Sequence, residues 1–467
     1  MLEKQSFSIV ILASLSGCAA TAGTASYRSL RADYDQTARA PKPASDDGRA
    51  LEAKAAAPDG TADRVLDRAA YVRAVLNRNP TIESARLGWR AAVAKVRGTG
   101  GFEDPMVDLG LAPLSVGSST THVGYQLGIS QKLPWFGKRS LEASVVAAEA
   151  EAAKNDFEAT RRELAMTAVS LYDQYFVTVR SLEINTEHLE LMRSLRGGAL
   201  AQFESGRGSA QDPLQAETEL ARIERDRTVL SSERDVVIAQ MNELLHREPA
   251  ASLPPPAKEL PLPPVRIGGE KELSREAAER RPDITALKQR ARAEQARADR
   301  AGREYFPDFT VSTSYNSMWA MPEHRWMVGL GFNLPIQAGA RAAAADEASA
   351  ARAKYVSDAR RLEASARTEV YVSVKKLEES RAVLRLFEER LLPVAHDQIE
   401  AARAGFTTSR NPFMAVVEAE RNLRSVELDY QMARAECDRR YAELERALGR
   451  IPGLESVDGR KEGIRDR

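Results

Sequence analysis

The chain has 467 residues, of which 43% are hydrophobic and 29% charged, a composition of folded rather than disordered proteins. Lysine plus arginine and aspartate plus glutamate both number 67, so the chain lacks the basic surplus typical of nucleic-acid-binding proteins. The chain has only two cysteines, Cys18 and Cys437, which are far apart in the sequence, so a disulfide framework is excluded. Its five histidines are scattered and do not have the spacing of zinc ligands. No run of about 20 apolar residues occurs, which excludes a transmembrane helix.

The N-terminus has the pattern of a lipoprotein signal peptide. In residues 1–17, Lys4 precedes an apolar stretch that is too short to span a bilayer. It ends in Leu15-Ser16-Gly17-Cys18, which resembles the lipobox of bacterial lipoproteins, with Cys18 as the lipidated residue. The alternative is an ordinary apolar leader with an incidental cysteine. Residues 18–62, rich in alanine, serine, aspartate and proline, are expected to form a lipidated, extended tether.

The rest of the chain repeats one pattern of turn residues at a nearly constant offset. Asn79-Pro80 and Arg281-Pro282 lie 202 positions apart, and Gly206 and Gly405 lie 199 apart. Between the halves, a proline-rich stretch can form neither a helix nor a central strand. The sequence therefore predicts a duplicated unit. Its expected parts are a first repeat at 63–248, a connector at 249–273, a second repeat at 274–450 and a charged tail at 451–467.

Each repeat contains two segments in which apolar residues alternate with small or polar ones, the period-2 pattern of β-strands. In one of them the apolar positions are Val123, Tyr125, Leu127 and Ile129. Each segment has about the 9–11 residues that a tilted strand needs to cross a bilayer. The predicted strands lie at about 105–116, 123–133, 307–317 and 326–335.

A long helical segment follows each pair of strands. Residues 136–204 contain no proline and keep apolar residues at steps of three and four, which is coiled-coil spacing. A helix of about 70 residues is roughly 100 Å long. Glycine and proline at 205–213 and at 404–412 predict sharp turns, so each long helix is expected to fold back as an αα-hairpin with a tip at these residues.

Four strands of membrane length cannot close a barrel, and an open sheet edge in lipid leaves backbone groups without partners. The smallest membrane barrels have eight strands. Two copies of the chain would supply eight strands and three copies twelve, and only the larger number leaves an open lumen. A lipidated barrel continued by a helical tube indicates a conduit.

The duplicated helix–strand–strand–long-helix order and the Gly-x-x-Ser-x-x-Asp-like tip motif resemble the TolC-like outer-membrane efflux protein family over essentially the whole mature chain. Asp104-Pro105-Met106 and the run from Gln131 to Lys138 resemble its heavy-metal branch, which exports copper and silver or cobalt, zinc and cadmium. The resemblance implies a mostly α fold with a β membrane part: a homotrimer with a 12-stranded outer-membrane β-barrel, continued by a periplasmic α-helical barrel.

The resemblance also implies partners and a location. The partners are a periplasmic membrane-fusion adaptor, an inner-membrane pump, often of the resistance–nodulation–division type, and outer-membrane lipid. No nucleic acid is expected among them. The protein is expected in the bacterial outer membrane, lipid-anchored and extending into the periplasm.

The predicted function is therefore the outer-membrane channel of a tripartite efflux system, a passive conduit for heavy-metal cations that needs no cofactor. One alternative is a multidrug or type I secretion outer-membrane channel. Another is a non-transporting coiled-coil envelope lipoprotein, which would explain the helices but neither the strands nor the duplication. An enzyme is not expected, because no nucleophile–base pair, phosphate loop or pair of catalytic carboxylates occurs at a characteristic spacing.

By resemblance, the hairpin tips contact the adaptor and close the periplasmic entrance. The alternative is turn chemistry alone, since glycine supplies positive φ angles and aspartate or asparagine caps the returning helix. The candidate tip residues are Gly206, Ser209, Asp212, Gly405, Thr408 and Asn411. Some family members carry two aspartates in the second tip, where this chain has Asn411 and Met414.

Aromatic residues flank the predicted strands, where amphipathic rings favour the membrane interface. The alternative is packing at the junction between strands and helices. The candidates are Trp135, Phe136, Tyr305, Phe306 and Trp326.

The loop between the third and fourth strands contains a speculative metal site. Met318, Met321 and His324 supply thioether and imidazole groups, which suit Cu(I) or Ag(I). The alternative is a loop with incidental methionines.

Overall fold

The computed structural model describes residues 21–38, 65–99, 101–117, 123–264, 267–408 and 410–454, which fall into two compact units. One unit combines parts of residues 1–40, 85–157 and 283–362 and holds the strands, so it is called the sheet unit here. The other, the helical unit, combines parts of residues 41–84, 158–282 and 363–467. The expected signal peptide at 1–17 and the lipidated Cys18 lie outside the described residues, as do residues 455–467 of the expected tail.

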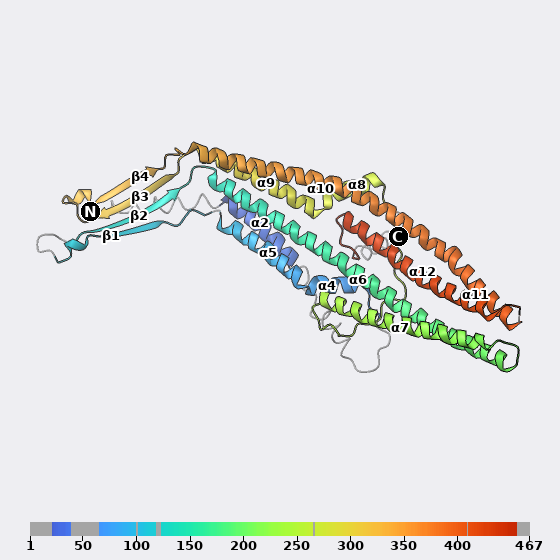
Figure 1. The fold of residues 1–467 in the computed structure, drawn as a ribbon. Helices are drawn as coiled ribbons and strands as arrows, with labels where there is room; N and C mark the ends of the chain where they lie inside the picture. The colour runs from blue at the N-terminus through green and yellow to red at the C-terminus, as the bar shows by residue number, and fades with distance from the viewer. Residues whose placement is uncertain are drawn as a thin grey trace, which may run out of the picture. The chain divides into compact units, whose positions relative to one another are not determined.

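Four antiparallel strands form one sheet in the order β1–β2–β3–β4 (Figure 1). The strands are β1 (Met106–Leu111), β2 (Tyr125–Leu133), β3 (Phe309–Asn316) and β4 (Trp326–Phe332). The central pair, β2 and β3, joins the two predicted repeats, with Leu127 opposite Tyr315. Among the described residues no strand pairs with the outer side of β1 or β4. The sheet therefore has two open edges.

β1, β3 and β4 are six to eight residues long, shorter than the expected 9–11, whereas β2 has nine. β1 ends at Leu111 because Pro113, which has no N–H to donate, begins a 3₁₀ turn over Pro113–Ser115. β4 ends at Phe332, three residues before Pro335.

The expectation of an extended tether is wrong for residues 21–38, which form helix α2 (Thr21–Ala38). Leu30 and Tyr34, one helical turn apart, are both buried. The Tyr34 ring packs edge-on against Trp89, with ring centroids 5.0 Å apart, and Asp33 forms an ion pair with Lys154. Tertiary packing of this kind, rather than helix propensity, stabilises most short helices.

The remaining helices of the sheet unit are α5 (Pro80–Gly98), α9 (Pro282–Arg303), and the first parts of α6 (Lys138–Glu204) and α10 (Ala338–Leu386). At 1.5 Å per residue, the 67 residues of α6 correspond to about 100 Å of helix. Within the described residues, none of the helices combines the length and the apolar character that a membrane crossing requires.

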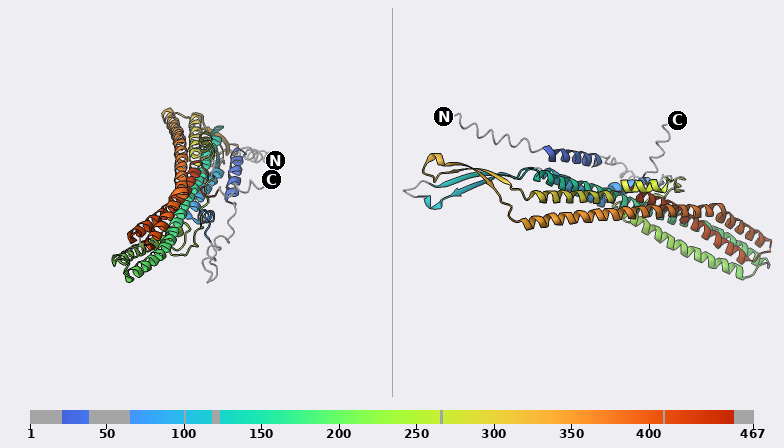
Figure 2. Two further views of the ribbon diagram at one scale, coloured as in Figure 1. Left: turned by 90° about the vertical axis from the view of Figure 1, so that its right-hand side faces the viewer. Right: turned by 90° about the horizontal axis from the view of Figure 1, so that it is seen from above.

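The helical unit contains the rest of α6 and α10 together with five further helices. These are α4 (Arg68–Arg78), α7 (Gln211–Leu244), α8 (Glu270–Arg280), α11 (Leu392–Thr407) and α12 (Phe413–Ala447). Both ribbon views show α7 folded back along α6 and α12 folded back along α11 (Figures 1 and 2). The chain thus forms two αα-hairpins, with a first tip at 205–210 and a second tip at 408–412.

The predicted repeats share one local backbone geometry. The residue that caps α4, Asn79 (φ −67°, ψ 125°), and the residue that caps α8, Arg281 (φ −67°, ψ 120°), have nearly the same conformation, and in both places a proline begins the next helix. The copies differ further on, because α6 is uninterrupted whereas a π-helical turn at Phe387–Leu391 separates α10 from α11. Pro393, which lacks an N–H, is the second residue of α11 after this turn.

Two of the apolar clusters in the described part of the helical unit concern the tips and Cys437. One joins α6, α7, α11 and α12 near the tips and includes Phe406 and Phe413, whose ring centroids are 5.3 Å apart. The other joins α8, α10 and α12 and contains Cys437, a buried thiol whose pKa is raised by burial. Cys437 is therefore a core residue, as its apolar register predicts.

Candidate functional site

The sheet presents an apolar face and a polar face. Residues opposite each other in the strand register share a face, so Leu109, Leu127 and Tyr315 lie together. The apolar face continues through Val107, Leu111, Ile129, Val311, Val328, Leu330 and Phe332, and each of these side chains is exposed. Val328, for example, is 84% exposed. A contiguous exposed apolar surface of this kind marks contact with lipid or with another protein.

The opposite face is built mostly from small and polar residues, and it also carries two exposed methionines, Met106 and Met327. It carries Gly110, Asp108, Gln126, Gly128, Ser130, Lys132, Thr310, Ser312, Ser314, Gly329 and Gly331. Side chains of this size and polarity leave room and favour contact with water.

Aromatic residues lie at both ends of the sheet. At the end that continues into the helices, the Trp135 ring stacks on Phe306, with centroids 5.1 Å apart, while Phe136 is 81% exposed. At the other end, Trp326 packs against Tyr315, with centroids 5.3 Å apart. Tyr305 lies half-exposed before β3. The aromatic residues predicted to lie at the membrane interface are thus found at both ends of the sheet. Tyr315, which the sequence analysis did not include among them, lies beside Trp326.

The buried Lys138 joins the strands to the helices. The Nζ atom of Lys138, at the start of α6, lies 2.8 Å from Asp308 Oδ1 and 3.2 Å from Glu304 Oε2. It also donates to the Phe306 carbonyl at 3.0 Å. Only 4% of Lys138 is exposed. The lysine therefore ties α6 to the segment between α9 and β3.

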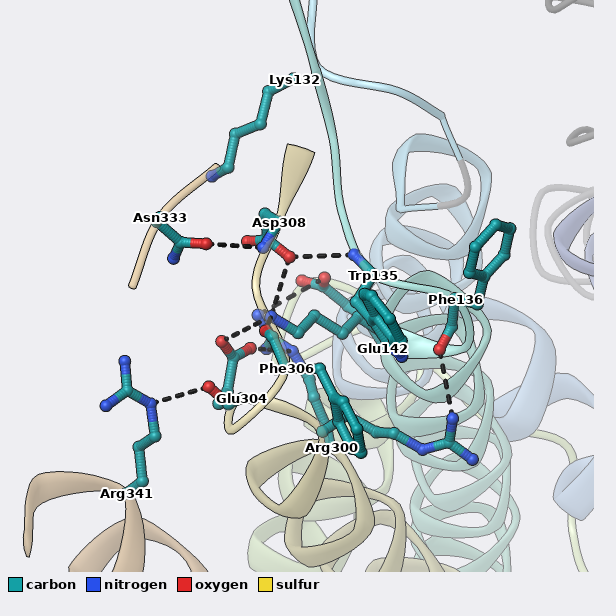
Figure 3. Close-up of polar contacts among 12 residues, drawn as sticks. Lys132, Trp135, Phe136, Glu142, Arg300, Glu304, Phe306, Asp308, Asn333 and Arg341 are labelled. Carbon is teal, nitrogen blue, oxygen red and sulfur yellow. Dashed lines mark hydrogen bonds and ion pairs between the residues drawn. The ribbon is translucent and has the colours of Figure 1, made fainter. Parts of the chain in front are cut away.

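Asp308 is the centre of this junction (Figure 3). Its Oδ1 accepts the Trp135 N–H at 2.9 Å, and its own N–H donates to Asn333 Oδ1 at 2.6 Å. Burial raises the pKa of the Asp308 carboxyl, but the bonds from Lys138 and Trp135 outweigh it and hold the pKa below its usual range. The sequence analysis missed both charged residues, although Lys138 lies in the run that it singled out.

The first tip is a glycine-ended helix followed by a reciprocal cap. Gly206 is in the left-handed region (φ 73°), which lets the Arg207 N–H donate to the Gln202 carbonyl at 2.9 Å. Ser209 Oγ accepts the Gln211 N–H at 3.2 Å, and Asp212 Oδ2 accepts the Ser209 N–H at 3.3 Å. Turn chemistry thus accounts for Gly206, Ser209 and Asp212, all of which are exposed or half-exposed.

The second tip uses its glycine differently. A Cβ on Gly405 would collide with the Asn411 amide, and the Gly405 carbonyl accepts the Arg410 and Asn411 N–H groups at 2.8 and 3.1 Å. The Thr408 hydroxyl donates to the Ala404 carbonyl at 3.0 Å. The candidate residues of this tip therefore close one tight turn together.

Buried contacts between charged side chains link the two hairpins at positions outside the tips. His188 of α6 lies between two carboxylates of α12: its Nδ1 is 3.0 Å from Glu420 Oε1 and its Nε2 is 2.7 Å from Glu427 Oε2. Arg421 of α12 makes a two-pronged contact with Glu219 of α7, with Nε 2.8 Å from Oε2. His188, Glu219 and Glu420 are almost fully buried. The sequence analysis did not predict these contacts between the two hairpins.

The charge states follow from these contacts. Burial lowers the pKa of the His188 imidazole, but the hydrogen bonds and charges of Glu420 and Glu427 outweigh it and raise the pKa to about 9. Both ring nitrogens therefore donate at neutral pH. The hydrogen bonds from Arg421 hold the pKa of Glu219 below its usual range.

Two of the three candidate metal residues, Met318 and His324, contact residues that do not bind metals. The Met318 side chain lies against Gly124, and the His324 ring meets Trp319 edge to face, with centroids 6.2 Å apart. Met321 is 57% exposed. Across the part of the chain that the structure describes, no group of three or more histidine, cysteine, aspartate or glutamate side chains suits a metal ion.

Comparison with known proteins extends these observations. Residues 273–450 match the family model described as outer membrane efflux protein. A search of curated proteins gives no match.

Solved structures share the fold of the chain. The outer-membrane channel OprN is 22% identical, with a TM-score of 0.67, over 81% of this chain and 89% of that one. CusC, described for its transmembrane channel formation, is 18% identical, with a TM-score of 0.70, over 84% of this chain and 95% of that one. The outer membrane protein VceC from Vibrio cholerae is 18% identical, with a TM-score of 0.67, over 82% of this chain and 96% of that one.

Proposed function

We propose, from the outer membrane efflux protein domain that this chain carries at residues 273–450 and from its channel fold, that the protein is the outer-membrane channel of a tripartite efflux system. The domain match and the shared fold support the efflux family expected from the sequence, and the fold is mostly helical, as expected. The observation that carries the proposal is the sheet: an exposed apolar face, a polar face of small residues, and two open edges.

The open edges support a trimer. A lipid-exposed edge would leave backbone N–H and C=O groups without partners, at a cost of several kcal/mol for each group. Pairing β4 of one copy with β1 of the next removes both edges. Three copies of four strands make a barrel of twelve, with the apolar face toward lipid and the polar face toward the lumen.

The proposed channel lets substrate pass through it and does not change the substrate chemically. Substrate would arrive from an inner-membrane pump through a periplasmic adaptor, pass the hairpin tips and leave through the barrel. The exposed tips, at Asp212 and Asn411, are the proposed contact with the adaptor. Opening would be a shift of the hairpins between two packings, favoured by the adaptor.

Heavy-metal cations are the proposed substrate, on the strength of the sequence resemblance at 104–106 and 131–138. Growth of a deletion strain tests this against copper, silver, zinc, cobalt and cadmium, alongside dyes, detergents and antibiotics. Sensitivity confined to metals is the expected result. Sensitivity to organic compounds alone would assign the chain to multidrug export instead.

Membrane attachment through Cys18 is part of the proposal. Metabolic labelling with a radioactive or clickable fatty acid should mark the wild-type protein and leave Cys18→Ala unlabelled. Labelling of both would contradict the anchor at this residue.

Charged substitutions on the two faces of the sheet test the membrane assignment. Leu330→Arg places a cation on the apolar face, at a cost of about 2–4 kcal/mol in a bilayer, and should abolish assembly in the outer membrane. Thr310→Arg, on the neighbouring strand but on the polar face, is the matched control and should assemble. Normal outer-membrane assembly of both variants would contradict a lipid-facing apolar surface.

A further inference from the structure

A pocket of about 570 Å³ lies between α6 and α12 in the helical unit. Its apolar wall includes Leu171 and Val177 of α6 and Met432 of α12. Its polar residues include Asp173 of α6 and Glu436 of α12. The volume suits a small organic molecule with an apolar body.

Asp173 is the unusual member of this pocket. Only 4% of the residue is exposed, and within the described part of the chain neither carboxylate oxygen accepts a hydrogen bond. Burial raises the pKa of this carboxyl to about 7, although the charges of Arg68 and Arg439 lower it in part. A buried carboxylate without donors costs free energy that a ligand with N–H donors would recover.

The arginines near Asp173 already have carboxylate partners. Arg439 pairs with Glu436, Arg68 pairs with Asp438, and Arg440, which also contacts Glu436, pairs with Glu443 at 2.8 Å. The negative charge of Asp173 is therefore the one that these pairs leave over. A cationic ligand would balance it.

We propose that this pocket binds a small amphiphilic amine, whose ammonium group donates to the Asp173 carboxylate while its apolar body packs against Leu171, Val177 and Met432. The cation is an amine rather than a divalent metal, because the described residues offer no cluster of three metal-ligating side chains. The proposal is independent of the proposed transport function.

Calorimetric titration of the full-length protein in detergent tests the site, with 2-phenylethylamine as the probe and empty micelles as the blank. At about pH 8 the amine is charged, while 2-phenylethanol has the same body without the charge. We expect saturable binding of the amine and none of the alcohol. Asp173→Asn should weaken amine binding at least about tenfold, whereas Asp235→Asn, an exposed carboxylate on α7, should not change it.

A second variant separates ligand loss from misfolding. Val177→Phe narrows the pocket and leaves Asp173 in place, so it should also weaken the amine. Circular dichroism of each variant monitors folding. Equal amine affinity in the wild type and Asp173→Asn, saturable binding of the alcohol with the same affinity, or no saturable amine binding to the wild type would each overturn the proposal.

Discussion

At the residue scale, the two tips depend on glycine for different physical reasons. Gly206 adopts a positive φ of 73°, which any side chain would strain, although no atom lies within 4 Å of an added Cβ. Gly405 is helical, and its requirement is space, because the Asn411 amide lies against it. Backbone conformation sets the first requirement and packing the second.

Gly206→Ala should therefore destabilise the first tip by about 1–2 kcal/mol, the cost of a left-handed alanine. Gly197→Ala, earlier in the same helix and in open space, is the matched control and should stabilise the helix by about 0.5–1 kcal/mol. Hydrogen exchange of the amides at the end of α6 measures both effects. Equal protection in the two variants would contradict the assignment.

The His188 imidazolium makes stability depend on pH. Its pKa of about 9 lies above the ordinary 6.5, so its contribution is complete below about pH 6.5 and is lost as the pH rises through about 9. The difference in melting temperature between the wild type and His188→Gln should shrink over this window. A difference that stays constant from pH 6 to about pH 9.5 would show that His188 is not charged in the folded protein.

At the element scale, the Lys138 side chain connects the start of α6 to the segment between α9 and β3. Lys138→Met should destabilise the protein by about 3 kcal/mol, because it leaves Asp308 half-buried without its cation. Lys132→Met is the control, since Lys132 and its partner Glu103 are both exposed and such pairs contribute about 0–1 kcal/mol. Urea unfolding measures both variants, and equal destabilisation would mean that the junction has no special role.

Local patterns in the sequence predict most of the elements. Strand alternation and helical spacing repeat within a few residues, so β2, α6 and both tips follow from the chain alone. Proline positions likewise explain why α5 and α9 begin at Pro80 and Pro282.

Contacts between distant residues explain what the sequence does not predict. Helix α2 depends on Trp89, which lies 55 positions after Tyr34. Lys138 and Asp308 are 170 positions apart, and His188 and Glu420 are 232 apart. No local spacing indicates such pairs. The predicted repeats align the connection from β2 to α6 with the connection from β4 to α10, but Asp308 precedes β3, so this alignment does not indicate which charges meet.

At the scale of the whole molecule, the central claim is that three chains close one barrel through the open edges of β1 and β4. An isolated four-stranded sheet with an exposed apolar face is not stable in lipid or in water. The assembly, rather than the single chain, is therefore the functional unit in this account.

The most direct test measures mass and conductance on the same sample. Protein purified from outer membranes in detergent should have the mass of three chains by native mass spectrometry, and it should conduct ions in planar bilayers. The Leu330→Arg variant, refolded in the same detergent, should do neither. A monomeric wild-type protein that does not conduct would contradict the channel.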